Sequence, residues 1–409
     1  MAFMTKTAPP SRAGAWSAVA ALTLCVSTLI ASEFMPVSLL TPLASDLHLS
    51  EGQAGQAIAV SGVFAVLTSL FIASASRTLD RRALLLGLTA LMLVSGLTVA
   101  LAPSYFVLMA GRALLGVVIG GFWSMSTATV MRLVPEGDVP RALGLLNGGN
   151  ALATTIAAPL GSLLGAWIGW RGAFFCVVPL AAITFAWQYL TLPAMPAREA
   201  ASPAAAFRVL RRPLAPYGIL AVTLLFMGQF ALFTYLRSFL ETVTRVDVDT
   251  LSLLLLVVGL AGLVGTWLIG LLLRTRLYSL LVAMPLAMAA VALGLIALGA
   301  STAATAILLA LWGLIGTAAP VAWWTWQAKT LPEDVEASGG LMVAAIQLAI
   351  TLGASAGGLL FDAGGYQATF AFAAAILVGS ALTALVAARR AAPPEELRGS
   401  LAELTGATV

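Results

Sequence analysis

The sequence predicts an all-α integral membrane protein in which twelve transmembrane helices form two pseudo-symmetric six-helix halves. The first observation is composition: 60% of the 409 residues are hydrophobic and 9% are charged, with a mean hydropathy of +1.00. Soluble domains carry about 25% charged residues. The second is that apolar runs of about twenty residues, enough to cross a bilayer, recur along the chain. The third is an internal repeat at an offset of 196 residues.

Charged residues, prolines and glycines separate the apolar runs and define the expected spans. Residues 1–193 are expected to form the first half, 194–213 a cytoplasmic linker, and 214–409 the second half with a short cytoplasmic tail. The twelve expected spans cover residues 16–43, 53–76, 83–102, 105–131, 142–167, 172–192, 214–239, 251–273, 277–300, 304–327, 341–361 and 368–388.

The two halves repeat in sequence. Residues 161–170 match residues 357–366 without gaps, and residues 133–136 match 330–333 at nearly the same offset. The offset also pairs Glu33 and Phe34 with Gln229 and Phe230. A parallel repeat of six spans is typical of one class of secondary transporter, whose site lies between the halves near the middle of the membrane.

The distribution of basic residues predicts the orientation in the membrane. Of the 21 lysines and arginines, seventeen lie in the termini and in the even-numbered loops. Positive charge accumulates on the cytoplasmic side, so both termini are expected in the cytoplasm. The apolar run after Arg12 is too long for a signal peptide, which favours an uncleaved first span.

Composition also argues against several functions. His48 is the only histidine, which excludes a histidine-based metal cluster, and the two cysteines lie in apolar segments. The sequence has no phosphate-binding GxxxxGK[ST] motif and no Ser-x-Gly motif with a partner base. The net charge of +4 comes from arginines in loops and does not indicate nucleic acid. We therefore expect no metal, no cofactor and no enzymatic activity.

Glu33 is the only carboxylate between residues 16 and 43, inside the first expected span. An ionised side chain at the centre of a membrane helix costs roughly 2.5–3.5 kcal/mol on insertion scales. Glu33 must therefore face a polar cavity, bind a partner or carry a proton, and we interpret it as a proton-coupling residue. The alternative is a protonated Glu33 that makes a hydrogen bond between packed helices.

Arg112 lies in the fourth expected span at a comparable depth. A carboxylate whose proton affinity changes when a cation or substrate moves is what coupling requires, and Arg112 is the nearest expected cation. The alternative is a static buried ion pair with Glu33. In the same span Gly116 and Gly120 lie four residues apart, which predicts close approach of a neighbouring helix.

Motifs that contain these residues resemble those of a known family. The chain resembles the major facilitator superfamily, in its drug:proton antiporter branch, over about residues 16–390. The pattern Arg112-x-x-x-Gly116-x-x-x-Gly120 is similar to the fourth-span motif whose arginine is linked to proton coupling. The resemblance therefore implies a proton-coupling role for Arg112 and alternating access of the two halves.

Two further motifs resemble gating elements of that family. Ala158-Pro159-Leu160-Gly161 is similar to the antiporter signature of the fifth span, with alanine in place of the usual glycine before Pro159. Asp80-Arg81 is similar to the loop motif that gates the cytoplasmic side, with serine at position 76 in place of its leading glycine. The resemblance implies gating roles for Pro159, Asp80 and Arg81.

Several runs resemble bacterial purine ribonucleoside exporters: residues 33–42, 120–126, 131–135, 228–235 and 346–348. This resemblance implies proton-driven efflux of nucleosides such as inosine and guanosine across the bacterial inner membrane. The remaining expected partners are protons and lipid, and the chain is expected to be a monomer. Polar and aromatic side chains inside spans are expected to face the interior and bind substrate, although each could instead serve interhelical packing. The candidates are Trp123, Asn150, Gln229, Phe233, Tyr235, Trp323 and Gln347.

Four other functions stay open at this point. A multidrug exporter of the same fold would have a larger, more apolar cavity, and a sugar exporter would have fewer aromatic and more polar lining residues. A passive facilitator differs from the expected exporter only in lacking a role for Glu33. An intramembrane enzyme is disfavoured because the spans lack histidine and a pair of acids.

Overall fold

The computed structural model describes residues 12–75, 79–196, 208–273, 276–331 and 335–391. Position 76 of the loop motif, residues 197–207 of the expected linker and residues 392–409 of the expected tail lie outside these ranges. Every regular element in the described ranges is helical. The elements are α1 (Arg12–Ser38), α2 (Leu40–Asp46), α3 (Glu51–Ala75), α4 (Arg81–Ala100), α5 (Tyr105–Leu133), η1 (Glu136–Asp138), α6 (Val139–Phe175), α7 (Val177–Thr191), α9 (Ala215–Phe233), α10 (Leu236–Phe239), the π-helix η2 (Leu240–Thr244), α11 (Val248–Leu272), α12 (Leu277–Leu298), α13 (Thr302–Thr330) and α14 (Val335–Ala391).

Ten helical segments of the described chain are long and apolar enough to cross a membrane. Two of them, Glu136–Thr191 with 56 residues and Ser338–Ala391 with 54 residues, are far too long for one crossing. A straight helix of that length would extend about 80 Å, whereas the hydrocarbon core is about 30 Å thick. The expected all-helical membrane class is therefore confirmed, and the two long segments must change direction.

Each long segment is interrupted at one glycine. Gly169 has φ 73° and Gly365 has φ 68°, in the left-handed region that a side chain disfavours. The two glycines are 196 residues apart, the offset of the sequence repeat, and each lies in the gap expected between two spans. The helix α13 likewise begins and ends 197 residues after α5, and α11 begins and ends 197 residues after α3.

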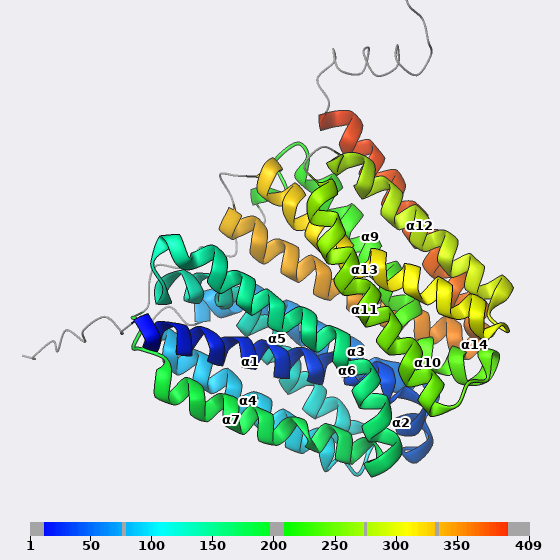
Figure 1. Ribbon diagram of the computed structural model, residues 1–409, viewed down its shortest axis with the longest axis horizontal. Helices are drawn as coiled ribbons and strands as arrows, with labels where there is room; N and C mark the ends of the chain where they lie inside the picture. The colour runs from blue at the N-terminus through cyan, green and yellow to red at the C-terminus, as the bar shows by residue number, and fades with distance from the viewer. Residues whose placement is uncertain (1–11, 76–78, 197–207, 274–275, 332–334, 392–409) are drawn as a thin grey trace, which may run out of the picture.

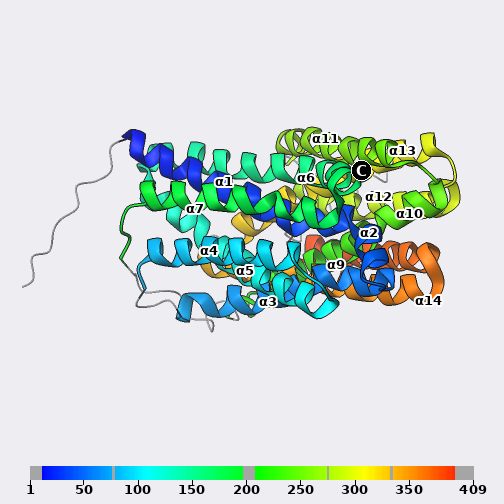
Figure 2. The ribbon, with the colours of Figure 1, turned by 90° about the horizontal axis from the view of Figure 1, so that it is seen from below.

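The helices gather in two groups. Figure 1 shows α1, α4, α5, α6 and α7 together on one side, and α9 and α11 to α14 together on the other. We call α1 to α7 the first group and α9 to α14, with η2, the second group. They meet where α14 packs on α3 and where α6 packs on α11, and Figure 2 shows these two contacts on opposite faces of the molecule. The apolar core of the second group extends across this boundary to Val37, Ile58 and Ala158 of the first.

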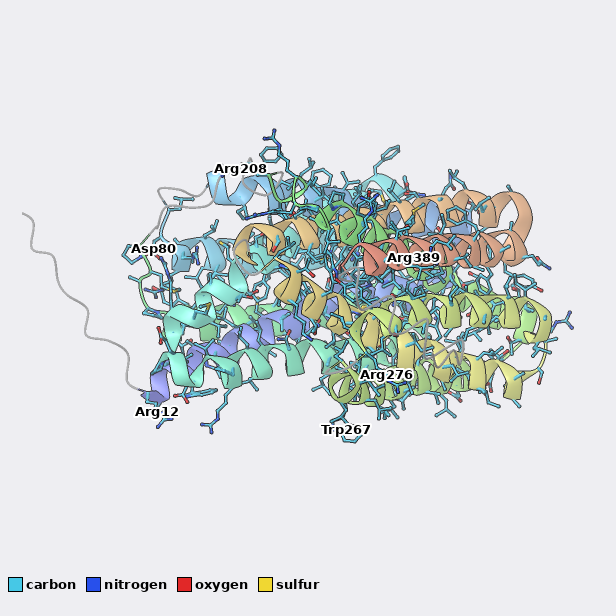
Figure 3. The ribbon with its side chains drawn as sticks, turned by 90° about the horizontal axis from the view of Figure 1, so that it is seen from above. Arg12, Asp80, Arg208, Trp267, Arg276 and Arg389 are labelled. Carbon is cyan, nitrogen blue, oxygen red and sulfur yellow. The ribbon has the colours of Figure 1, made fainter. Side chains whose placement is uncertain are left out.

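Hydrogen bonds identify the two ends of the bundle. At one end, Arg171 binds Asp46 and the carbonyl of Ala102, and we call this the Asp46 end. At the other end, which we call the Asp80 end, Arg12 binds Asp138 and Asp80 accepts from the backbone N–H of Met195. Between the ends, large apolar side chains are exposed on the outer surface, and Figure 3 shows Trp267, 68% exposed, pointing away from the helices. Such a surface suits contact with lipid.

Close helix packing confirms the glycine prediction in α5. A Cβ atom added at Gly116 would lie 2.8 Å from Cβ of Phe64, and one at Gly120 would lie 2.9 Å from the backbone nitrogen of Ser69. Real Cβ atoms essentially never approach so closely. The two glycines therefore let α5 lie against the backbone of α3, which brings Arg112 of α5 close to carbonyl groups of its neighbours.

Candidate transport site

Arg112 is completely buried and binds only neutral groups. Its Nε donates to the carbonyl of Ala57 at 2.8 Å, one terminal nitrogen donates to the carbonyl of Ser32 at 2.8 Å, and the other donates to the carbonyl of Glu33 and to Oγ of Ser61, both at 3.1 Å. The guanidinium of α5 thus binds α1 and α3 simultaneously. Its planar fork of donors suits this arrangement.

One of these bonds follows directly from the sequence of α1. Pro36 lies inside α1 and has no backbone N–H, so the carbonyl of Ser32, four residues earlier, loses its helical partner. In a membrane such a carbonyl has no water to bind and must find a donor in the protein. Arg112 supplies that donor. This geometry gives Arg112 a structural role that a sequence motif does not reveal.

The alternative of a buried ion pair between Glu33 and Arg112 is wrong for this conformation. Arg112 binds the backbone carbonyl of Glu33, while the carboxylate of Glu33 accepts from Nε2 of Gln347 at 3.3 Å. Both side chains of this second bond are buried, with Glu33 5% and Gln347 6% exposed. Since Glu33 lies in α1 and Gln347 in α14, the bond joins the two groups of helices.

The oxygen of the same amide has no partner. Oε1 of Gln347 is buried and makes no hydrogen bond within the described part of the chain. A buried acceptor left in this state costs about 1–3 kcal/mol. The amide of Gln347 can therefore donate to an ionised Glu33 through its nitrogen, and its oxygen is available to accept from a donor.

Beside Glu33, an aromatic contact joins the same two groups. Phe34 stacks on Phe230 with ring centroids 5.8 Å apart and an interplanar angle of 24°. Phe230 also contacts Phe226 and Phe233. Phe34 and Phe230 were not among the site residues predicted from the sequence, although the repeat pairs them. The sequence signal that could have identified them is their equivalent position in the two copies of the repeat.

Gln229, the repeat partner of Glu33, makes a weaker contact within the second group. Its Nε2 lies 3.5 Å from the carbonyl of Gly316. That carbonyl has no helical partner because Pro320, four residues later in α13, lacks a backbone N–H. Its Oε1 is buried and makes no hydrogen bond to any described residue. Gln229 and Arg112 thus both donate to carbonyls that lack a helical partner because of a proline.

The other expected lining residues lie in different packing environments. Trp323 is 2% exposed and packs edge-to-face on Trp326 in the core of the second group. Tyr235 is completely buried, and its hydroxyl donates to the carbonyl of Ala354. Trp123 packs edge-to-face on Phe122 beside the core of the first group. Trp123, Asn150, Gln229 and Phe233 are only partly buried, whereas Tyr235, Trp323 and Gln347 are buried.

The gating candidates make contacts inside the first group. Oδ1 of Asp80 accepts from the backbone N–H of Arg82 at 2.7 Å and caps α4, while its Oδ2 accepts from Met195 at 2.9 Å. The backbone N–H of Arg81 donates to the carbonyl of Met195 at 2.9 Å. This loop therefore binds α4 to the chain that follows α7, and its gating role stays a prediction.

Pro159 is buried in α6 and frees the carbonyl of Thr155. A Cβ atom at Gly259 of α11 would lie 2.6 Å from that carbonyl oxygen, so the freed carbonyl faces the second group across a glycine.

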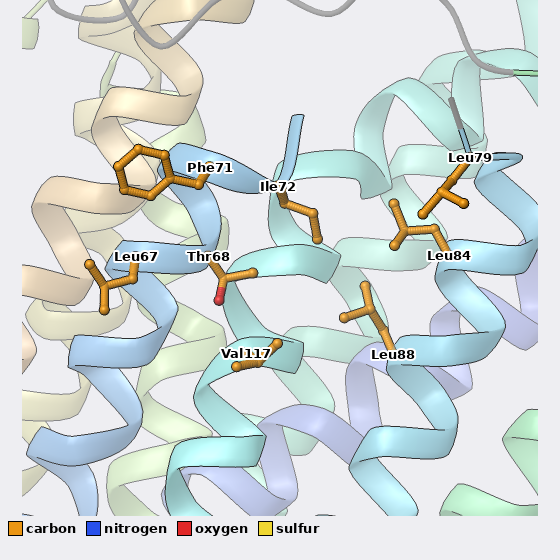
Figure 4. A pocket seen from close by; sticks show the side chains of 8 residues that line it. All are labelled: Leu67, Thr68, Phe71, Ile72, Leu79, Leu84, Leu88 and Val117. Atoms are coloured by element: carbon orange, nitrogen blue, oxygen red, sulfur yellow. The ribbon is translucent and has the colours of Figure 1, made fainter. Parts of the chain in front are cut away.

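Two grooves lie away from these residues. Figure 4 shows the first, of about 440 Å³, between α3, α4 and α5. Its lining is apolar except for Thr68. The second, of about 410 Å³, lies between α1 and α6 and includes Ser27 and Gly149. Neither contains a predicted site residue. Within the described ranges, His, Cys, Asp and Glu residues form no group that could hold a metal ion.

Comparison with known proteins identifies the family. The model of the Major Facilitator Superfamily matches residues 20–339. The chain belongs to this superfamily. It is 40% identical over 375 residues to the purine ribonucleoside efflux pump NepI of Salmonella typhimurium, covering 92% of this chain and 94% of that protein. It is also 59% identical over 388 residues to a protein of Pseudomonas aeruginosa named transcription regulatory protein OpdE, covering 94% and 96%.

Solved structures of superfamily transporters share the fold. A bacterial homologue of the human lysosomal transporter Spinster, inward-facing and unoccupied, has a TM-score of 0.73 and 17% identity, over 93% of this chain and 96% of that one. The inward-facing, occupied form of that homologue has a TM-score of 0.75 and 16% identity, over 93% and 98%. The family and the relatives named as pumps make this chain a membrane transporter, for which no catalytic activity is indicated.

Proposed function

We propose that this transporter is a proton-coupled exporter of purine ribonucleosides such as inosine and guanosine in the bacterial inner membrane. It uses alternating access of two six-helix halves, residues 1–193 and 214–409, joined by the linker 194–213. In this proposal the breaks at Gly169 and Gly365 separate paired spans, so that the chain crosses the membrane twelve times with both termini in the cytoplasm. It acts as a monomer and needs no cofactor.

One observation carries the proposal: the hydrogen bond from Gln347 to the carboxylate of Glu33, which joins the two groups of helices at 3.3 Å. When Glu33 is ionised, the nitrogen of Gln347 donates to it. When Glu33 is protonated, its hydroxyl needs an acceptor, and the unpaired oxygen of Gln347 is available. The hydrogen bond between the halves therefore changes its donor and its acceptor when Glu33 takes up or releases a proton, and such a proton-dependent change is required for coupling transport to a proton gradient.

The environment of this bond suits a neutral, planar substrate. Phe34 and Phe230 provide aromatic surface next to Glu33, and the buried oxygen of Gln229 can accept a hydrogen bond. Stacking of a base on an aromatic ring contributes roughly 1–3 kcal/mol, and a hydrogen bond adds about 0.5–1.5 kcal/mol. Neither interaction needs a charge, which leaves Glu33 free to carry the proton. The 40% identity to pumps named for purine ribonucleosides supports the same substrate class.

Transport in proteoliposomes tests the proposal. An imposed pH gradient should drive accumulation of labelled inosine, and guanosine should compete, whereas lipophilic cations and sugars should not. Accumulation of ethidium-like cations with no movement of nucleosides would establish the multidrug function instead. Nucleoside movement that ignores the pH gradient would make the protein a passive facilitator.

A second candidate function follows from the relative named as a transcription regulatory protein. A membrane transporter can regulate transcription indirectly, by lowering the cytoplasmic concentration of a compound that controls a regulator. A transport-deficient variant that is normally inserted would then lose export and regulation together. Retained regulation in such a variant would separate the two functions.

A further inference from the structure

At the Asp46 end, the two groups of helices are joined by charged residues of the second group that bind helix ends of the first. Asp362 of α14 accepts from Oγ of Ser50 at 2.6 Å and from the backbone N–H of Gly52 at 3.0 Å. Gly52 lies in the first turn of α3, a 25-residue helix, and its N–H is one of the four that lack a partner inside the helix. Asp362 therefore places a negative charge on the positive end of α3.

Arg237 makes the complementary contact. It is 5% exposed, forms an ion pair with Glu241 at 2.8 Å, and donates from its other terminal nitrogen to the carbonyl of Ser38. Ser38 is the last residue of α1, where carbonyl groups form the negative end of the helix. Arg237 therefore places a positive charge on that end. Each charge binds a backbone group at a helix end of the first group, and Asp362 binds the hydroxyl of Ser50 in addition.

Close backbone packing surrounds these two contacts. A Cβ atom at Gly358 of α14 would lie 3.0 Å from Cα and 3.1 Å from the carbonyl oxygen of Gly52. The hydroxyl of Tyr235 lies over Gly55 and donates to the carbonyl of Ala354 at 2.8 Å. Gln56 accepts from Ser355 at 3.1 Å one turn deeper. We call this region, residues 50–56 against 354–362, the seam.

We propose that Asp362 and Arg237 form a latch that holds the Asp46 end closed by binding the start of α3 and the end of α1. The latch must release before a substrate can leave through the seam. It rests on the proposed alternating access and orientation, in which the Asp46 end faces the outside.

Electrostatic repulsion alone would have the opposite effect on the seam when Asp362 is replaced. Glu51 interacts unfavourably with both Glu241 and Asp362, so the seam holds an excess of negative charge. If repulsion controlled the seam, removing the carboxylate of Asp362 would close it further. If the two hydrogen bonds to α3 control it, removing the carboxylate opens it. Whether the replacement of Asp362 opens or closes the seam therefore decides between repulsion and hydrogen bonding.

The test measures how quickly a cysteine in the seam reacts with a membrane-impermeant maleimide added to whole cells. Ser355→Cys is introduced in a chain whose two natural cysteines are replaced by alanine. Asp362→Ala should increase the labelling rate roughly tenfold or more, because the loss of a single hydrogen bond to a charged acceptor already corresponds to about tenfold. Asp362→Asn, which keeps one acceptor oxygen, should increase it less.

Two matched variants complete the design. Gly358→Ala forces the backbones apart without touching any charge and should also increase labelling. Asp247→Ala removes an aspartate that caps its own helix through Thr250 at 2.9 Å, and should leave labelling unchanged. Unchanged or slower labelling in Asp362→Ala would overturn the latch, whatever Gly358→Ala does. Faster labelling in a protein that moves no nucleoside would retain the latch and reject the substrate proposal.

Discussion

Replacing Glu33 by glutamine is expected to abolish proton coupling and leave the fold intact. Glutamine has nearly the same size and shape but cannot release a proton. In the structure the carboxylate is 5% exposed and accepts one hydrogen bond, from Gln347 at 3.3 Å, with no ion pair to lose. An amide at position 33 can still accept from the nitrogen of Gln347.

Two opposing energies determine the effect on stability. A hydrogen bond to a charged group contributes about 1.5–3 kcal/mol, whereas burying an ionised carboxylate in the membrane costs roughly 2.5–3.5 kcal/mol. The substitution removes the charge from both quantities while keeping an acceptor for Gln347, and the two changes nearly cancel. We therefore expect the unfolding free energy of Glu33→Gln to lie within about 1 kcal/mol of the natural protein.

The effect on coupling is much larger. One proton moving down a gradient of one pH unit releases about 1.4 kcal/mol, which supports roughly tenfold accumulation of a neutral substrate. Glu33→Gln should bring inosine in proteoliposomes to a concentration ratio of about 1, while exchange of labelled for unlabelled inosine continues. Glu136→Gln, the same replacement of an exposed acid in η1, serves as the control. Full pH-driven accumulation by Glu33→Gln would refute the assignment.

Three further outcomes are expected. A reporter fused at Arg208 should be cytoplasmic and one at Asp247 exported, and finding both on one side would reject the twelve-span topology. Trp323→Ala should lower the unfolding free energy by about 3–5 kcal/mol, measured by thermal denaturation, because Trp323 is a buried core residue. Arg171 donates to Asp46 and holds the pKa of that carboxyl below its usual range. Asp46→Asn should therefore reduce thermal stability at neutral pH, and the difference should disappear as pH falls through the lowered pKa of the folded state.

Sequence was sufficient for those features that depend on local composition. The ten membrane-length helical segments of the described chain follow from apolar length, and the breaks at Gly169 and Gly365 fall in predicted gaps because only glycine readily adopts their positive φ. Gly116 and Gly120 predicted close packing because a missing Cβ acts on whichever helix lies beside it. Orientation and substrate class remain predictions from charge distribution and resemblance.

Sequence was not sufficient for contacts that depend on which face of a helix meets which neighbour. Gln347 is 314 residues from Glu33, and no periodicity in either segment identifies the pair. Trp323 was expected to face the interior and bind substrate, and in this conformation it packs in the apolar core of the second group. Arg112 was expected to act on a charge, but its donors reach carbonyl oxygens instead.

The bonds of Arg112 could have been anticipated from one local signal, the proline in α1. Pro36 removes the N–H that the carbonyl of Ser32 would bind, and Arg112 replaces it at 2.8 Å. The same relation links Pro320, the carbonyl of Gly316 and Gln229 in the second half. A polar side chain in one span and a proline in another can thus be parts of one arrangement.

A double-mutant cycle between Arg112 and Pro36 tests this arrangement directly. Arg112→Ala leaves the carbonyl of Ser32 without a donor, whereas Pro36→Ala restores its helical partner. If Arg112 compensates for the proline, Arg112→Ala should cost about 1–2 kcal/mol less in the Pro36→Ala background than in the natural one. Pro285→Ala, which restores the same kind of bond inside α12 of the second group, provides the control and should combine additively with Arg112→Ala within about 0.5 kcal/mol. Unfolding free energies of the purified proteins give both coupling terms. Equal terms for the two prolines would show that Arg112 acts independently of the interruption in α1.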